Sequence, residues 1–126
     1  MPEYKTALVT GAQKGIGASI AKALINEGVN VVLNYLDDDS TVSSLVREAT
    51  DKGLKAEAVK ANVANRSEVV NLIDVAEKFG GLDYAVSNAA IYPRTPLLDM
   101  TEEEWKEVLD VNLNGFFSLY RQQPAA

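Results

Sequence analysis

A short apolar run followed at once by three glycines constrains the fold of this chain more than any other stretch. The run at residues 7–9 stops at Thr10, and Gly11, Gly15 and Gly17 follow. Gly11 suits a tight turn that a Cβ would obstruct, Gly15 lets a ligand approach the backbone, and Gly17 lets the next segment pack close to the strand. The spacing, Gly-x-x-x-Gly-x-Gly, differs from the commoner Gly-x-Gly-x-x-Gly, and glycines also mark ordinary strand-to-helix turns.

The segment after the third glycine has the apolar spacing of a helix. Ile16, Ile20, Ala23 and Leu24 recur at intervals of three and four, so they share one helix face. The first N–H groups of such a helix have no intrahelical partner and lie at the positive end of its dipole, where they suit a pyrophosphate. Strand, glycine turn and helix together favour a nucleotide site over a purely structural turn.

Four strand-like segments recur at nearly constant intervals along the chain. They are Thr6–Thr10, Asn30–Tyr35, Leu54–Ala61 and Leu82–Ser87. An amphipathic segment of helix length lies between each strand and the next, which gives a β-α-β-α-β-α-β rhythm. Such alternation implies a parallel sheet with helices on both faces. The sequence therefore predicts an α/β fold with a doubly wound, Rossmann-type parallel sheet.

Two helix starts carry the signature of a capping box. Asn65 with Glu68 three residues later predicts the start of a helix over Ser67–Phe79, and Thr101 with Glu104 predicts the start of the last helix. Between these helices, beyond the fourth strand, lies the longest irregular stretch, residues 89–100. It follows the carboxyl end of a strand, where open α/β sheets bind ligands.

The last helix carries a polar residue within its apolar stripe. Asn112 falls among the apolar positions Trp105, Val108, Leu109, Phe116 and Leu119. A buried amide must be hydrogen-bonded or it costs about 1–3 kcal/mol. Asn112 is therefore interpreted either as a structural residue that ties the helix to a neighbouring backbone or as a residue with a role in the chemistry.

Composition narrows the classes of function. The 126 residues include no cysteine and no histidine, which excludes disulfides and thiolate metal sites and removes the commonest general base, so we expect no metal. A net charge of −6 argues against nucleic acid as a partner. Apolar runs of only a few residues argue against a membrane span, and a start without an apolar core predicts a cytoplasmic protein.

With these residues in view, the chain resembles the N-terminal half of a short-chain dehydrogenase/reductase over nearly all of its length. Residues 10–17 match that family's cofactor loop, including its glycine spacing. Asn62 and Val63 stand where the family has Asp-Val beside the adenine, and an Asn keeps one acceptor oxygen. Asn34-Tyr35 at the end of the second strand is similar to many 3-oxoacyl-carrier-protein reductases.

Two later motifs extend the resemblance. Residues 87–90 stand where the family has Asn-Asn-Ala-Gly, matching at Asn88 and Ala89, while Ala90 replaces the glycine. Asn112, with Gly115 after it, matches the helix that carries the family's catalytic Asn, which holds the active-site lysine through a water. The resemblance thus implies a catalytic Asn112 and the dinucleotide contacts Gly11, Gln13, Lys14, Gly15, Ile16, Gly17, Tyr35, Asn62, Val63, Asn88, Ala89 and Ala90.

The resemblance also implies which parts of the family fold to expect. Residues 1–126 would form a partial Rossmann dinucleotide-binding domain, truncated after the fourth strand and the helix that follows it. The family's catalytic Tyr-x-x-x-Lys and its upstream serine would lie after Ala126. A small carbonyl or alcohol substrate is expected only where the missing half completes the site.

Residues near the second strand bear on the choice of cofactor, for which we expect NADP, with NAD as the alternative. Lys14 either meets the 2′-phosphate of NADP or is a solvated surface lysine. The acidic residues 37–39 follow the strand about where a carboxylate would bind the ribose hydroxyls of NAD. Tyr35 occupies the strand-end position where NAD-preferring relatives often carry Asp, which favours NADP.

Three functions are consistent with these observations. The chain is the cofactor-binding half of an NADP-dependent oxidoreductase, a catalytically silent nucleotide-binding module, or a truncated subunit that acts through another chain. The glycine loop favours the first two, and the absence of Tyr-x-x-x-Lys favours the last two for this chain alone. A free edge on the fourth strand and the apolar stripe of the last helix predict a homo-oligomer or other association.

Overall fold

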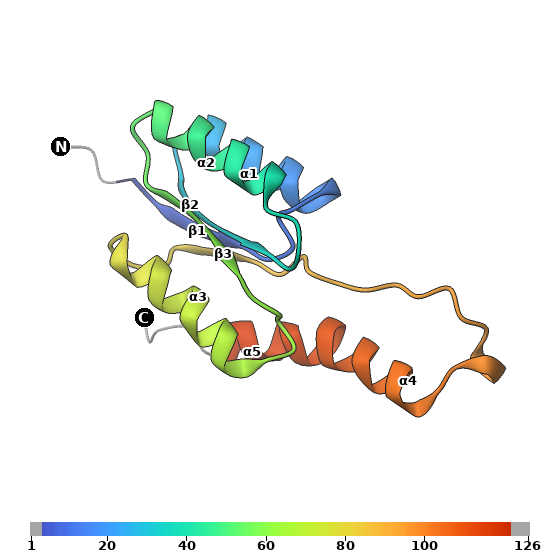
Figure 1. Cartoon of the computed structure of the whole chain (residues 1–126). Coiled ribbons are helices and arrows are strands. Elements are labelled where there is room, and N and C mark those ends of the chain that lie inside the picture. The colour runs from blue at the N-terminus through green and yellow to red at the C-terminus, as the bar shows by residue number, and fades with distance from the viewer. Residues whose placement is uncertain (1–3, 122–126) are drawn as a thin grey trace.

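The computed structural model describes residues 4–121 as parallel strands alternating with helices (Figure 1). The first six elements are strictly alternating strands and helices: β1 (Thr6–Val9), α1 (Gly15–Asn26), β2 (Asn30–Tyr35), α2 (Ser40–Asp51), β3 (Ala56–Lys60) and α3 (Arg66–Lys78). The others are β4 (Tyr84–Val86), a 3-10 turn η1 (Leu97–Asp99), α4 (Glu102–Leu109), a π-helical turn η2 (Asp110–Asn114) and α5 (Gly115–Arg121). The predicted β-α rhythm is confirmed.

The strands form one parallel sheet in the order β3-β2-β1-β4. In the register, Leu8 of β1 pairs with Val32 of β2 on one side and with Ala85 of β4 on the other. Helices α1 and α2 cover one face, and α3 and α5 cover the other (Figure 1). The doubly wound, Rossmann-type α/β fold predicted from the sequence is therefore confirmed.

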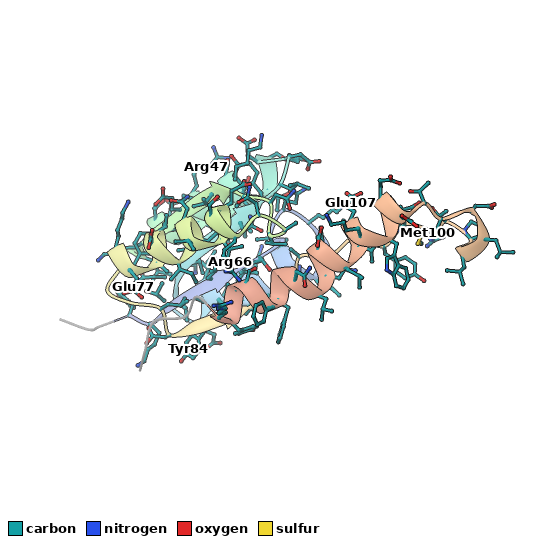
Figure 2. The ribbon with its side chains drawn as sticks, turned by 90° about the horizontal axis from the view of Figure 1, so that it is seen from below. Arg47, Arg66, Glu77, Tyr84, Met100 and Glu107 are labelled. Atoms are coloured by element: carbon teal, nitrogen blue, oxygen red, sulfur yellow. The ribbon has the colours of Figure 1, made fainter. Side chains whose placement is uncertain are left out.

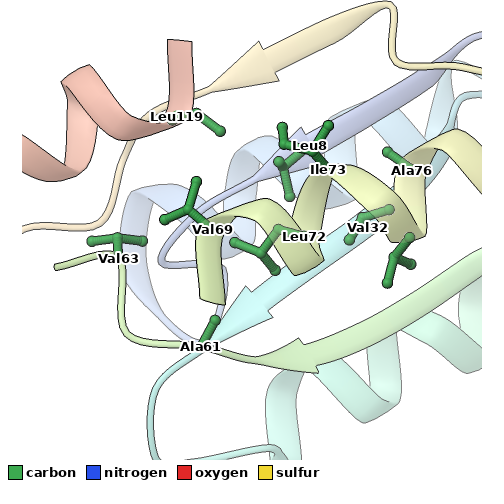
Figure 3. Close-up of a cluster of buried hydrophobic side chains, with 10 residues drawn as sticks. Leu8, Val32, Ala61, Val63, Val69, Leu72, Ile73, Ala76 and Leu119 are labelled. Carbon is green, nitrogen blue, oxygen red and sulfur yellow. The ribbon is translucent and has the colours of Figure 1, made fainter. Parts of the chain in front are cut away.

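Helices on both faces explain why the central strands β1 and β2 are mostly apolar and almost entirely buried. Successive side chains of a strand point to opposite faces, so a sheet covered on both sides buries every position. Leu8 and Val32 pack with Leu72 of α3 and Leu119 of α5 in one cluster (Figure 3). Val9 points the other way, into the cluster that α1 and α2 cover.

The third and fourth strands are shorter than the predicted ranges 54–61 and 82–87. β3 starts late because the N–H of Leu54 still donates to Ala49 O at the end of α2. β4 stops at Val86 because the N–H of Asn88 donates to the hydroxyl of Thr10 rather than to a neighbouring strand. Side-chain and turn hydrogen bonds thus replace the ladder at both strand ends.

The predicted helix caps are confirmed, but the capping boxes are not reciprocal. The side chain of Asn65 accepts from the N–H groups of Ser67 and Glu68, and Thr101 accepts from Glu104 N. The carboxylate of Glu68, however, accepts from Asn62 N. Glu104 likewise reaches away from its cap, to the hydroxyl of Thr95. Both carboxylates therefore tie their helices to the preceding loop.

The last helix differs most from expectation. It is interrupted by η2, and its apolar stripe divides between two sides: Leu119 is buried, whereas Trp105, Leu109 and Phe116 are exposed. The prediction that Asn112 lies in a buried stripe is wrong, because its side chain is exposed. Figure 2 shows α4, with Glu107, extending away from the sheet, so little of the described part of the chain is near enough to cover this stripe.

Within residues 4–121, no helix is long and apolar enough to cross a membrane.

Candidate functional site at the carboxyl edge of the sheet

A cavity of about 430 Å³ opens at the carboxyl edge of the sheet, a volume typical of small-molecule sites. It brings together segments that are far apart in the sequence. The predicted contact residues that line it are Gly11, Gln13, Lys14, Gly15, Ile16, Asn62, Val63, Asn88, Ala89 and Ala90. Three other predicted site residues, Gly17, Tyr35 and Asn112, do not line it.

The glycine loop adopts the conformations that its spacing predicts. Gly11 and Gly15 have φ values of 65° and 57°, in the left-handed region that favours glycine. A Cβ on Gly17 would collide with Gly11 O and lie 2.5 Å from Asn88 Nδ2. Gly17 therefore acts through packing, because it lets α1 start against the loop and the segment after β4.

A buried amide that sequence reasoning did not place in the site anchors this loop. Asn34, near the end of β2, is only 2% exposed. Its Oδ1 accepts from Gly11 N at 2.9 Å, and its Nδ2 donates to Ala61 O at 2.9 Å. The backbone carbonyl of Asn34 also accepts from Ala12 N. The available signal was a polar residue that directly follows the apolar run 31–33 within the strand.

The segment after β4 binds the glycine loop on the side opposite to Asn34. The N–H groups of Asn88 and Ala89 donate to the Thr10 hydroxyl at 2.9 and 3.1 Å. Asn88 Nδ2 also donates to Gly11 O at 3.1 Å. The peptide group of Gly11 is thus bonded on one side through Asn34 and on the other through Asn88, which fixes the loop before any ligand binds.

The N-terminus of α1 opens onto this cavity without a side-chain cap. Its N-cap residue Lys14 is extended, makes no side-chain capping hydrogen bond, and no acidic residue lies in the first turn. Gly15 and Ile16, at the start of the helix, line the cavity. Free N–H groups and the positive dipole end make such a terminus complementary to an anion.

Charged side chains around the cavity are few. Among the described residues that line it, Lys14 is the cation, and Asp37 and Glu107 are the carboxylates. Asp38 lies just outside, where hydrogen bonds from the backbone N–H and then the hydroxyl of Ser40 hold the pKa of Asp38 below its usual range. The loop after β2 is therefore anionic at neutral pH.

The end of β2 faces the cavity through residues other than the predicted Tyr35. Tyr35 packs partly buried against the core cluster on the α1 and α2 side. Leu36 and Asp37 line the cavity instead. Asn34 lines the cavity, and because successive side chains of a strand point to opposite faces, Tyr35 points away from it. The role of Tyr35 in cofactor binding stays a prediction.

The predicted adenine-side residues lie in the turn after β3. The Oδ1 of Asn62 accepts from Ala64 N at 2.9 Å, so part of its acceptor capacity is used within the turn. Val63 is buried and packs against α5, where a Cβ on Gly115 would lie 2.9 Å from Val63 Cγ2. The turn is therefore held by an internal hydrogen bond and by packing against α5.

The amide of Asn112 ties η2 to the segment after β4. Its Oδ1 accepts from Ile91 N and its Nδ2 donates to Ile91 O, each at 2.9 Å. The pair resembles two rungs of a strand ladder, as expected for the structural interpretation of this residue. Ile91 and Val111 both line the cavity, so Asn112 positions its wall from behind.

In this chain, a glycine loop leads from a parallel strand into an uncapped helix at the carboxyl edge of a doubly wound sheet. This arrangement is characteristic of Rossmann-type dinucleotide-binding folds. The family model described as "short chain dehydrogenase" matches residues 5–124. This chain belongs to the short-chain dehydrogenase family.

Individual relatives agree with this assignment. The chain is 45% identical over 119 residues to a 3-oxoacyl-(acyl-carrier-protein) reductase of Staphylococcus aureus, covering 94% of this chain and 48% of the relative. A short-chain dehydrogenase from Burkholderia cenocepacia, solved in complex with NADP, is 37% identical with a TM-score of 0.89, covering 94% of this chain and 49% of that one. A blue fluorescent protein from a metagenomic library, solved with NADPH, is 30% identical with a TM-score of 0.87 over the same shares. The chain thus spans about half the length of these relatives.

Proposed function

We propose that this chain is the cofactor-binding half of an NADP-dependent oxidoreductase that transfers hydride between the cofactor and a small carbonyl or alcohol. The observation that carries the proposal is the uncapped N-terminus of α1, which lies with its glycine loop on the cavity. The names of relatives support it, because one is a reductase and two were solved with NADP or NADPH. Residues 1–126 are proposed to form one partial dinucleotide-binding domain.

The cavity residues fit such a cofactor chemically. The N–H groups at Gly15 and Ile16 would bind the pyrophosphate, for which the missing Cβ of Gly15 leaves open space. Lys14 would meet the 2′-phosphate, and Asn62 with Val63 would contact the adenine. When bound, NADPH supplies the hydride. The proposed role of residues 88–90 is to form the wall beside the reacting ring of the cofactor.

A titration of the 126-residue chain with NADP and with NAD tests the cofactor assignment. NADP should bind more tightly, and Lys14→Ala should weaken NADP binding roughly ten- to hundredfold, because a hydrogen bond to a charged group contributes about 1.5–3 kcal/mol. Lys22→Ala is the matched control, since Lys22 lies on α1 outside the cavity lining and pairs with Glu48. Tighter binding of NAD, with no effect of Lys14→Ala on either cofactor, would contradict the assignment.

We further infer that the chain associates with a second copy of itself. The support is a face of large apolar side chains on α4 and α5, including Trp105, Leu109 and Phe116, that no other described part of the chain covers. Exposed apolar faces of this kind mark protein contacts. We also propose the cytoplasmic location that the sequence predicts.

A further inference from the structure

The side chain of Gln13 joins the glycine loop to the loop after β2. Its Oε1 accepts from Leu36 N at 2.6 Å and from Asp37 N at 3.3 Å. Its Nε2 donates to Asp37 Oδ1 at 2.8 Å. One side-chain amide thus engages both the backbone and the carboxylate of this loop. No other hydrogen bond links the described side chains of these two loops.

The bond from Gln13 restrains the one carboxylate of the loop that reaches the cavity. Asp37 lines the cavity, whereas Asp38 and Asp39 do not. Asp37 is exposed, so without a partner its side chain would sample several rotamers. Gln13 is followed directly in the sequence by Lys14, which is the one cationic residue among the described residues that line the cavity. The same loop therefore presents a cation and holds an anion.

We propose that Gln13 is a positioning residue for cofactor selection, which holds the Asp37 carboxylate against the glycine loop so that a 2′-phosphate fits beside Lys14. This inference rests on the proposed dinucleotide function. A released Asp37 would approach the phosphate of NADP, where like charges repel, or accept hydrogen bonds from the ribose hydroxyls of NAD. Gln13 therefore shifts the preference of the site toward NADP without touching the reacting atoms.

A double-mutant cycle tests whether Gln13 acts through Asp37. Gln13→Ala should raise the Kd for NADP about fivefold and change the Kd for NAD about twofold or less, because the repelled phosphate carries two charges close to one carboxylate. Asp37→Asn keeps an acceptor for Gln13 but removes the charge, so the preference should move toward NADP. In the Asp37→Asn background, Gln13→Ala should leave the ratio of the two Kd values unchanged.

Two further variants separate this role from a structural one. Gln13→Met keeps the length of the side chain and removes its polar atoms, so it should shift the ratio as Gln13→Ala does. Asp39→Asn is the matched control, because it removes the same charge from the same loop outside the cavity lining and should not change the ratio. Amide exchange gives a readout without cofactor: Leu36 N–H should exchange faster in Gln13→Met than in the wild type.

Each outcome of these experiments has a definite meaning. If the wild-type chain binds neither dinucleotide, the proposed function and this inference both fail. If both dinucleotides bind and the Gln13 variants leave the ratio unchanged, only this inference fails. It also fails if the ratio shifts equally in the presence and absence of the Asp37 charge, since Gln13 would then act on the loop alone.

Discussion

Two buried asparagines of β2 show how one residue type serves different purposes at the two ends of a strand. Asn30 is 3% exposed, and its Oδ1 accepts from Lys55 N at the amino end of the sheet. Asn34 is 2% exposed, and it bonds Gly11 N at the carboxyl end, beside the cavity. Each side-chain amide accepts a hydrogen bond from a backbone N–H group outside its own strand, but only Asn34 supports the glycine loop.

Replacing each asparagine by alanine should separate stability from binding. Asn34→Ala leaves Gly11 N and Ala61 O without their side-chain partner, and Asn30→Ala leaves Lys55 N without one. Each change should lower the free energy of unfolding by about 1–3 kcal/mol in chemical denaturation. Only Asn34→Ala should also weaken dinucleotide binding below the unfolding transition. Equal weakening by both variants would contradict a specific role for Asn34.

The glycines of the loop are constrained by different physics, which a second pair of variants resolves. Gly15 has a positive φ and open space around it, so Gly15→Ala should cost about 1–2 kcal/mol of stability from backbone strain. Gly17 has no positive φ, but its Cβ would collide with Gly11 O, so Gly17→Ala should displace α1 and cost up to about 3 kcal/mol. Thermal or urea unfolding measures both, and a smaller loss for Gly17→Ala than for Gly15→Ala would contradict this assignment.

Among the helices and strands, the sequence predicts those features that depend on residues close together in the chain. The apolar runs of β1 and β2 and the caps at Asn65 and Thr101 depend on neighbours within a few residues, and they are confirmed. The π-helical turn η2 was not predicted. The apolar stripe of the last helix was expected to promote association, but the sequence did not show which of its residues, such as Trp105, are exposed. Both the turn and this exposure depend on what packs against the last helix, and an apolar stripe does not reveal which of its sides finds a partner.

In the candidate site, too, the sequence predicts local features but not contacts between distant segments. The glycine spacing predicts the loop because φ and contact distance are properties of single residues. The Asn34–Gly11 and Gln13–Asp37 contacts depend on which loops the folded sheet places side by side, and their partners are 23 and 24 positions apart in the sequence. Tyr35 was named from its strand-end position in the family motif, which does not give the direction of its side chain, whereas Leu36 and Asp37 line the cavity.

The pairing of Asn112 with Ile91 connects two elements and predicts a local effect. Asn112→Ala removes both hydrogen bonds, so the amide of Ile91 should exchange faster with solvent, and stability should fall by about 1 kcal/mol. Asn114→Ala is the matched control, because Asn114 bonds Asp110 within its own helix and leaves Ile91 protected. Unchanged exchange at Ile91 in Asn112→Ala, measured by amide exchange with mass spectrometry or NMR, would contradict this role.

For the molecule as a whole, the exposed face of α4 and α5 and the free edge of β4 lie close together. Tyr120 of α5 donates its hydroxyl hydrogen to Ala85 O of β4. Thr10 N donates to the next carbonyl, Val86 O, from the β1 side, so the Ala85 carbonyl points to the free edge. The Tyr120 hydroxyl therefore bonds one backbone carbonyl on the edge of β4 that faces away from β1.

Association through this face should depend on its apolar side chains. Sedimentation velocity at micromolar concentration should show dimers or larger species. Phe116→Glu should shift the chain toward monomer, because association would bury the introduced carboxylate without a partner of opposite charge. Ser44→Glu adds the same charge to an exposed position of α2, on the other face of the sheet, and should have no effect. A wild-type chain that stays monomeric at high concentration would contradict the inferred self-association.

The last prediction is that the chain alone does not catalyse hydride transfer. A tyrosine in water ionises at about pH 10, so the family's chemistry needs a lysine one helical turn away to activate it at neutral pH. In this sequence no tyrosine is followed four residues later by lysine, and after Tyr120 that position is Pro124. The hydroxyl of Tyr120 is also engaged by Ala85 O. The purified chain with NADPH and a panel of ketones, β-ketoesters and aldehydes should therefore show no loss of NADPH absorbance. Turnover that persists through purification and is abolished by Asn112→Ala would refute this prediction, because it would place a complete proton-transfer system within these 126 residues.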